Sequence, residues 1–167
     1  GVALALIDGN QSCFVNSATG YAWGDYLVQE LPKKLAGWFP ISPEGKDRRV
    51  MGVGTGGYGA LMAAQNAPDS FAGAAAVNPV FDVSCLYGTD YEPKPEYLFG
   101  EKEALASQGY ALSTKFQIPV QLYCDADHEE QARQWAQNGT QITVETVSAD
   151  NLLEEAFQKY VEGGIRV

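Results

Sequence analysis

Short apolar runs alternate along the chain with longer stretches in which apolar residues recur at helical spacing. Five runs have the length and composition of strands: residues 3–7, 49–53, 74–77, 120–124 and 141–147. Strands that alternate with helices are typical of parallel sheets joined by crossover connections. The pattern therefore predicts a three-layer α/β/α fold with a mostly parallel sheet, and we expect residues 1–167 to form a single domain.

The stretches between these runs predict helices with one apolar face. Such a face is expected over residues 25–38, although Pro32 lies within that segment, and again over residues 129–137 and from Leu152 onward. A further helix is expected to begin within the glycine run at residues 52–59. This order of strand, tight turn and helix places the glycine run at the carboxyl end of a strand.

Composition and charge narrow the class of protein. Hydrophobic residues make up 46% of the chain and charged residues 19%, and no apolar run reaches the roughly 20 residues that cross a bilayer. The formal net charge is −10, so the chain repels phosphate backbones and anionic lipids. We therefore expect a soluble protein with neither nucleic acid nor a membrane as its partner.

The cysteines and the histidine indicate in which cellular compartment the protein is expected and whether it is expected to bind a metal ion. Three cysteines, Cys13, Cys85 and Cys124, are too few and too widely spaced for a disulfide framework, which favours a reducing, cytoplasmic location. His128 is the one histidine, and neither Cys-x-x-Cys nor His-x-x-x-His spacing occurs. No metal and no cofactor is expected.

The glycine run carries the most specific motif. Residues 51–61 read MGVGTGGYGAL, which resembles the nucleophile elbow G-x-S-x-G-G-Y-G-A-L of α/β-hydrolases of the esterase D, S-formylglutathione hydrolase and mycolyltransferase type. The likeness extends upstream to residues 8–10 and 23–31 and downstream to residues 68–72. The sequence is therefore identified as a member of this esterase group, shorter than its usual domain.

The resemblance implies a catalytic triad and an oxyanion hole at defined positions. The nucleophile position falls on Gly54, and the backbone N–H of Thr55 matches one oxyanion donor. The acid position falls on Asp127, with Asp125 as the second candidate, and the histidine position falls on Ala149. Two of the three triad positions thus lack the side chain that the chemistry requires.

The missing triad side chains predict a protein that binds a ligand without converting it to product. Loss of a triad nucleophile costs on the order of a million-fold in turnover, so we expect a pseudoesterase that binds a small ester-like ligand or a protein partner. Trp23, Tyr58 and Tyr91 are the candidate ligand-binding side chains. Tyr91 belongs to the long aromatic connection over residues 81–116, which we expect to lie above the carboxyl-terminal edge of the sheet as a lid or binding loop.

The resemblance also implies a gap in the sheet. The likeness begins at the fourth strand of the family, and the family strand that would lie between residues 3–7 and 49–53 has no counterpart. Either these two runs pair directly, or an N-terminal segment or a protein partner completes the sheet. Unpaired strand edges bind other strands readily.

Two other functions fit parts of the sequence. An active carboxylesterase or acyl hydrolase with an unrecognised nucleophile would use Ser12, Ser17 or Thr55 together with Asp127 and His128. A dinucleotide- or phosphate-binding domain would use the spacing Gly52-x-Gly54-x-x-Gly57 after a strand. That fingerprint also requires an acidic residue about 20 positions further on, where this chain has Asn78.

Overall fold

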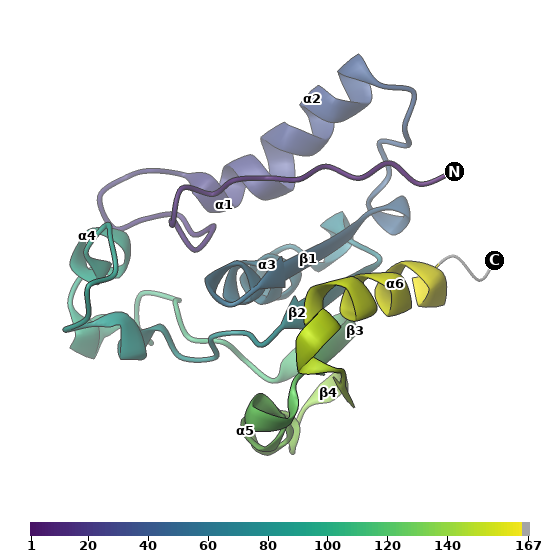
Figure 1. Cartoon of the computed structure of the whole chain (residues 1–167). Coiled ribbons are helices and arrows are strands. Elements are labelled where there is room, and N and C mark those ends of the chain that lie inside the picture. Colours follow the sequence, from purple (N-terminus) through teal and green to yellow (C-terminus); the bar gives the residue numbers. More distant parts are fainter. Residues whose placement is uncertain (165–167) are drawn as a thin grey trace.

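The computed structural model describes residues 1–164 and contains a four-stranded, wholly parallel sheet. The strands are β1 (Arg49–Val53), β2 (Gly73–Val77), β3 (Lys115–Cys124) and β4 (Thr140–Thr146), in the spatial order β1-β2-β3-β4 (Figure 1). Their carboxyl ends therefore meet at one edge of the sheet, where ligands of open α/β sheets bind.

Within residues 1–164, six α-helical segments accompany the sheet. They are α1 (Trp23–Asp25), α2 (Leu31–Trp38), α3 (Thr55–Asn66), α4 (Pro95–Phe99), α5 (Ala126–Ala136) and α6 (Leu152–Gly164). A π-helical stretch at Tyr26–Glu30 joins α1 to α2, so the helix predicted over residues 25–38 is confirmed with a local irregularity. Pro32 is the second residue of α2, which follows this irregularity directly.

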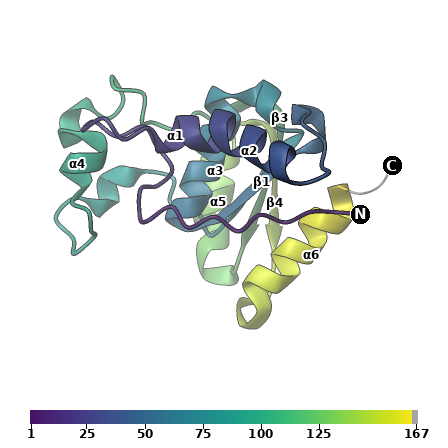
Figure 2. The same cartoon turned by 90° about the horizontal axis from the view of Figure 1, so that it is seen from above.

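The sheet is covered on both faces. Helices α3 and α5 pack on one face, where Leu61 and Ala132 meet Leu122 of β3. Helix α6 packs on the other face, where Ala156 and Tyr160 meet the opposite side of β2 and β3 (Figure 2). The predicted three-layer α/β/α architecture is confirmed, and alternate residues along the strands serve the two cores.

The strand expected at residues 3–7 is not formed. Residues 1–8 are all exposed and lie outside any strand, and β1 is the terminal strand on that side of the sheet. An apolar run becomes a strand only where a neighbouring backbone can pair with it, and among residues 1–164 no strand adjoins this segment. Direct pairing of residues 3–7 with β1, one of the two arrangements predicted, is therefore wrong.

The long connection is a packed unit at one end of the molecule. It contains α4 and the 3₁₀ turns Val83–Leu86 and Lys102–Ala104. Phe99 and Tyr110 of this connection contact each other and enclose the ring of Tyr58, in the first turns of α3. Because α3 starts at the carboxyl end of β1, the connection lies at the sheet edge that was expected. Within residues 1–164 no helix has the length and apolarity of a membrane span.

Candidate functional site

The turn between β1 and α3 is built around a glycine with a left-handed backbone. Gly54 has φ +56° and ψ −118°, a conformation that a residue with a Cβ adopts only under strain. Its N–H donates to the Val77 carbonyl at 3.0 Å, and its carbonyl accepts from the Tyr58 and Val80 N–H groups, each at 3.1 Å. A Cβ built on Gly54 meets no atom within 4 Å, so a side chain at this apex would stand clear of the protein.

A second glycine allows the strand and the helix to approach closely. A Cβ at Gly52 would collide with the backbone carbonyl of Gly56 and the backbone nitrogen of Gly57. Both contacts are with backbone atoms, which cannot swing away. The lack of a side chain at Gly52 therefore allows β1 and α3 to approach closely, and the positive φ of Gly54 allows the chain to reverse between them.

A tyrosine from the long connection covers the start of α3. The Tyr91 hydroxyl donates to the Gln11 carbonyl at 2.7 Å and lies 3.2 Å from Cys13 Sγ, and the Thr55 side chain is near enough to lower the pKa of Tyr91. Burial raises the pKa of Tyr91, so its hydroxyl keeps its proton at neutral pH. This one hydroxyl joins the connection, the loop at residues 10–14 and the first residue of α3.

The thiol beside Tyr91 is not a nucleophile. Cys13 is buried, and desolvation raises the pKa of its thiol to about 11. Only the thiolate attacks efficiently, and it is scarce at neutral pH at such a pKa. The loop that carries Cys13 is strained, because four of its residues have positive φ: Asn10, Gln11, Cys13 and Phe14.

The junction between β3 and α5, which contains both candidates for the acid position, holds the Asp125 carboxylate in a defined orientation. Asp125 is the N-cap of α5, and its Oδ1 accepts from the N–H groups of Asp127 and His128, each at 3.1 Å. Its Oδ2 accepts from Asn78 Nδ2 at 2.7 Å, and His128 Nδ1 lies 2.6 Å from Oδ1. The hydrogen bond from His128 is the main cause that lowers the pKa of Asp125. Asp127, the residue placed first by the sequence, is exposed in the first turn of α5.

The His128 ring is oriented by this carboxylate. An ionised carboxylate only accepts hydrogen bonds, so the short contact places the proton of a neutral imidazole on Nδ1 and leaves Nε2 as an acceptor. The side chain is 50% exposed, so Nε2 is within reach of solvent or of a ligand. The active-hydrolase alternative paired His128 with Asp127, whereas the structure pairs it with Asp125.

Asn78 connects the glycine turn to the acid loop. It directly follows Val77, which accepts from Gly54, and its side chain both donates to Asp125 and accepts from the Asp125 N–H at 3.2 Å. The ends of β1, β2 and β3 thus place Gly54, Asn78 and Asp125 in neighbouring positions. The sequence offered one signal for this role: an asparagine followed by proline at the end of a buried strand.

Ala149, the position that the resemblance assigns to the histidine, follows the strand at the other end of the sheet from β1. Ala149 is exposed in the 3₁₀ turn Ala149–Asn151, which follows β4. Since β4 is three strands from β1, a spacing of about 4.8 Å per strand separates their ends by about 14 Å. The side chain of a histidine at this position would have to reach across the ends of β2 and β3 toward Gly54.

The candidate ligand-binding aromatics differ in exposure. Tyr58 is fully buried, and its hydroxyl donates to the Tyr110 carbonyl at 2.6 Å, so in this structure it belongs to the core behind the turn. Trp23 is partly exposed and packs edge-on against Phe14 and Tyr26. The Tyr91 hydroxyl contacts the loop at residues 10–14. Their assignment to a ligand site stays a prediction.

The alternative nucleophiles serve local turns. Ser12 is buried and its Oγ accepts from the Phe14 N–H at 3.2 Å. The Oγ of Ser17 accepts from the Tyr21 N–H at 2.9 Å and lies 3.2 Å from the Thr19 hydroxyl. Among residues 1–164 no group of three or more His, Cys, Asp or Glu side chains is arranged to hold a metal ion.

The parallel sheet, its helical layers and the glycine turn after β1 define the α/β-hydrolase class of fold. FphF, a fluorophosphonate-binding serine hydrolase of Staphylococcus aureus, matches with a TM-score of 0.73 at 18% identity, over 94% of this chain and 69% of its own. The S-formylglutathione hydrolase FrmB of the same organism gives 0.68 at 17% identity, over 96% of this chain and 69% of its own. An S-formylglutathione hydrolase from Agrobacterium tumefaciens gives 0.64 at 15% identity, over 92% of this chain and 62% of its own.

Within that class, the chain belongs to the esterase family described as "Putative esterase", which it matches over residues 8–165. The membership predicted from the glycine turn is confirmed. The solved structures, at these identities, show the shared fold.

Proposed function

We propose that this protein is an esterase-fold binding protein that has lost serine-type catalysis, and that it takes a small ester-like ligand at the carboxyl-terminal edge of its sheet. The observation that carries the proposal is the geometry of Gly54. The turn keeps the left-handed conformation and the open apex of a nucleophile position, yet residue 54 has no oxygen to attack a carbonyl.

The neighbouring hydroxyl is a poor substitute. Thr55 is the first residue of α3, one position beyond the apex of the turn, and its side chain lies near the Tyr91 hydroxyl. Its backbone N–H, in contrast, lies in the first turn, where an α-helix provides no acceptor, so it stays suited to bind a carbonyl oxygen. The site can therefore polarise an ester carbonyl without attacking it.

The His128–Asp125 pair favours a second candidate, an acyl hydrolase with a displaced base. A carboxylate-oriented imidazole is the arrangement by which a histidine takes a proton from a nucleophile. The pair has no hydroxyl or thiol partner in the hydrogen bonds of the described residues. We rank this candidate second for that reason.

Hydrolysis of a short-chain p-nitrophenyl ester separates the two. We expect the parent chain to be inactive, Gly54→Ser to gain little, and Gly54→Ser/Ala149→His to gain measurable turnover. The matched control is Gly88→Ser/Ala149→His, because Gly88 also has positive φ and free space around a built Cβ. Parent activity that disappears in His128→Gln or Asp125→Asn would establish the second candidate.

A chemical probe and a binding measurement complete the test. A fluorophosphonate reacts with activated serines, so intact mass should show labelling of the double variant and none of the parent. Titration of a p-nitrophenyl ester into ¹⁵N-labelled parent protein should shift the amide signals of Thr55 and Gly56 and leave that of Ala132, in the middle of α5, unchanged. Absence of any shift near α3 would reject the binding part of the proposal.

A further inference from the structure

The middle of the long connection is tied to the rest of the chain through one side chain. We call residues 89–94, with the sequence TDYEPK, the strap. Its residues are exposed except Tyr91 and Pro93, which are partly buried. The Thr89 hydroxyl donates to the Leu86 carbonyl at 2.7 Å, within the connection. Among residues 1–164, the hydrogen bonds that leave the connection from the strap all belong to Tyr91.

Tyr91 is placed between the strap and the proposed ligand site. Its hydroxyl donates to the Gln11 carbonyl at 2.7 Å and lies 3.2 Å from Cys13 Sγ, and its ring packs against the cluster that contains Cys13 and Tyr58. The Thr55 side chain lies near the same hydroxyl. This side chain therefore stands beside the first residue of α3, whose N–H is the proposed donor to a ligand carbonyl.

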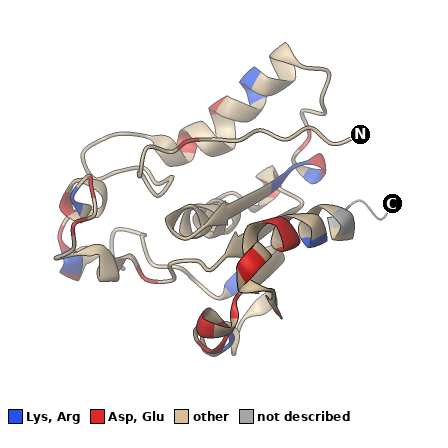
Figure 3. Ribbon diagram, viewed as in Figure 1, with Lys and Arg blue, Asp and Glu red and all other residues tan. Residues whose placement is uncertain are grey.

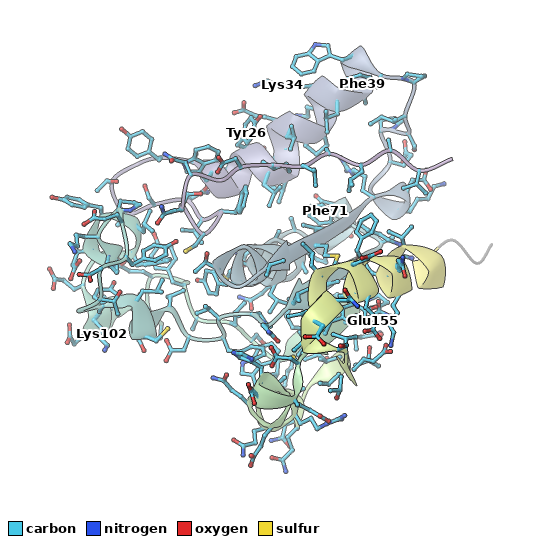
Figure 4. All side chains as sticks on the ribbon, viewed as in Figure 1. Tyr26, Lys34, Phe39, Phe71, Lys102 and Glu155 are labelled. Carbon is cyan, nitrogen blue, oxygen red and sulfur yellow. The ribbon has the colours of Figure 1, made fainter. Side chains whose placement is uncertain are left out.

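The two ends of the strap are held independently of Tyr91. Before the strap, the Tyr87 hydroxyl donates to the Gly100 carbonyl at 2.6 Å, and Lys102 Nζ lies 5.9 Å from the centre of the Tyr87 ring (Figure 4). After the strap, three residues of α4 are buried: Pro95, Leu98 and Phe99. The middle of the strap can therefore move away while both of its ends stay in place.

No ion pair reinforces the contact between the strap and the loop at residues 10–14. Residues 9–24 contain no Asp, Glu, Lys or Arg, and Figure 3 shows this part of the ribbon without charged residues, whereas the connection carries both signs. Within the strap, Lys94 Nζ lies 3.2 Å from a carboxylate oxygen of Glu92. The contact thus depends on one hydroxyl and one ring, and a hydrogen bond of this kind changes an equilibrium by about tenfold or less.

We propose that the strap is a gate for the ligand site at the start of α3, with the Tyr91 hydroxyl as its latch, and that a ligand reaches Thr55 only when the latch has opened. The ligand part of this inference rests on the proposed function, whereas the opening of the latch does not. Because the ligand binds the open form alone, its apparent affinity is reduced by the fraction of molecules that are open.

Thiol labelling tests the latch without a ligand. Cys13 lies beneath Tyr91, so iodoacetamide reaches it when the strap opens; peptide mapping of the Cys85→Ser chain measures the rate. We expect Tyr91→Phe to raise the rate about three- to tenfold, at low and high salt alike. Loss of the Tyr91 hydrogen bond by itself raises the pKa of the Cys13 thiol, so faster labelling reports opening and not activation of the thiol.

A second tyrosine provides the matched control. The Tyr110 hydroxyl donates to the Asn16 carbonyl at 2.8 Å, so it also links the connection to the first part of the chain, but from outside the strap. Tyr110→Phe should leave the labelling rate of Cys13 unchanged. Cys124 is buried in the core of the sheet and reports global unfolding in the same samples. No increase in Tyr91→Phe, or an equal increase in both variants, would overturn the proposal.

A ligand titration tests the gate. A short-chain p-nitrophenyl ester is titrated into the ¹⁵N-labelled Cys85→Ser chain with and without Tyr91→Phe, and the Thr55 amide signal is followed. We expect Tyr91→Phe to tighten binding by the factor found in thiol labelling. Weaker binding would show that the hydroxyl holds the ligand instead of excluding it, and would overturn the gate. Absence of binding in both proteins would reject the proposed function, and the labelling rates would still decide whether the latch exists.

Discussion

Nδ1 of His128 lies 2.6 Å from Oδ1 of Asp125, three residues earlier in the same loop-to-helix junction. The carboxylate is fixed from the other side by Asn78, which extends from the end of the neighbouring strand. The geometry couples the first turn of α5 to the end of β2. It also orients a proton-accepting nitrogen at the edge where the glycine turn lies.

The Asp125 carboxylate makes stability depend on acid pH. Its pKa is lowered in the folded state from the ordinary value of 3.8, mainly by the hydrogen bond from His128, so the unfolded chain binds the proton more tightly. The stabilisation is present above that ordinary value and is lost as pH falls through the lowered folded pKa. Thermal melts from neutral pH to pH 3 should show a smaller acid-induced loss in Asp125→Asn than in the parent and in the exposed neighbour Asp127→Asn.

Removal of the Asn78 amide should loosen the acid loop. Asn78→Ala removes the hydrogen bonds to the Asp125 carboxylate and from the Asp125 N–H, and we expect a loss of about 1–3 kcal/mol in the free energy of unfolding. Urea denaturation measures the loss. Asn138→Ala, at an exposed position after α5, provides the comparison and should change stability little. Equal effects of the two substitutions would contradict the role assigned to Asn78.

The two turn glycines should respond differently to alanine. Gly52→Ala forces a Cβ into the backbone of Gly56, and we expect a loss above about 3 kcal/mol or a failure to fold. Gly54→Ala meets no atom but must adopt positive φ, at a cost of about 1–3 kcal/mol. Gly37→Ala, in α2 with free space around it, should stabilise the chain by up to about 1 kcal/mol. Chemical denaturation orders the three.

Thiol modification should distinguish the cysteines by burial. Cys13 and Cys124 are buried, and desolvation raises the pKa of each thiol to about 11, whereas Cys85 is exposed. Iodoacetamide at pH 8 should therefore modify Cys85 first in the native chain and all three in urea. Mass spectrometry of native Cys85→Ser should show little modification. Rapid native labelling of Cys13 would show that the contact with Tyr91 opens readily.

Much of the fold could be predicted because its signals are local. Four of the five expected strands form, since their runs lie beside another strand, and the glycine turn between β1 and α3 is visible from the spacing alone. The run at residues 3–7 is apolar like the other four, but it does not form a strand. Strand formation also depends on a neighbouring strand, which the local sequence does not reveal.

The candidate site was less accessible to prediction. Whether Asp125 or Asp127 faces the neighbouring strand depends on which residue caps α5, and that is decided by the backbone of the junction. Asn78 lies 47 residues before Asp125 in the chain. It reaches the Asp125 carboxylate only because the carboxyl ends of β2 and β3 are neighbours in the sheet, which the sequence does not reveal. The burial of Tyr58 and the contacts of Tyr91 likewise depend on how the long connection packs, which the sequence alone does not show.

The Tyr91 hydroxyl links segments that are far apart in the chain: Cys13 and Gln11 precede it by 78 and 80 residues. Closing such a loop costs entropy, whereas the pairing of β1 with β2 joins segments that are closer in sequence. We therefore expect these contacts to form after β1, α3 and β2. We expect the Tyr91 contacts with the loop at residues 10–14 to be among the last parts to assemble. In native-state hydrogen exchange they should also be among the first to open, well before the sheet.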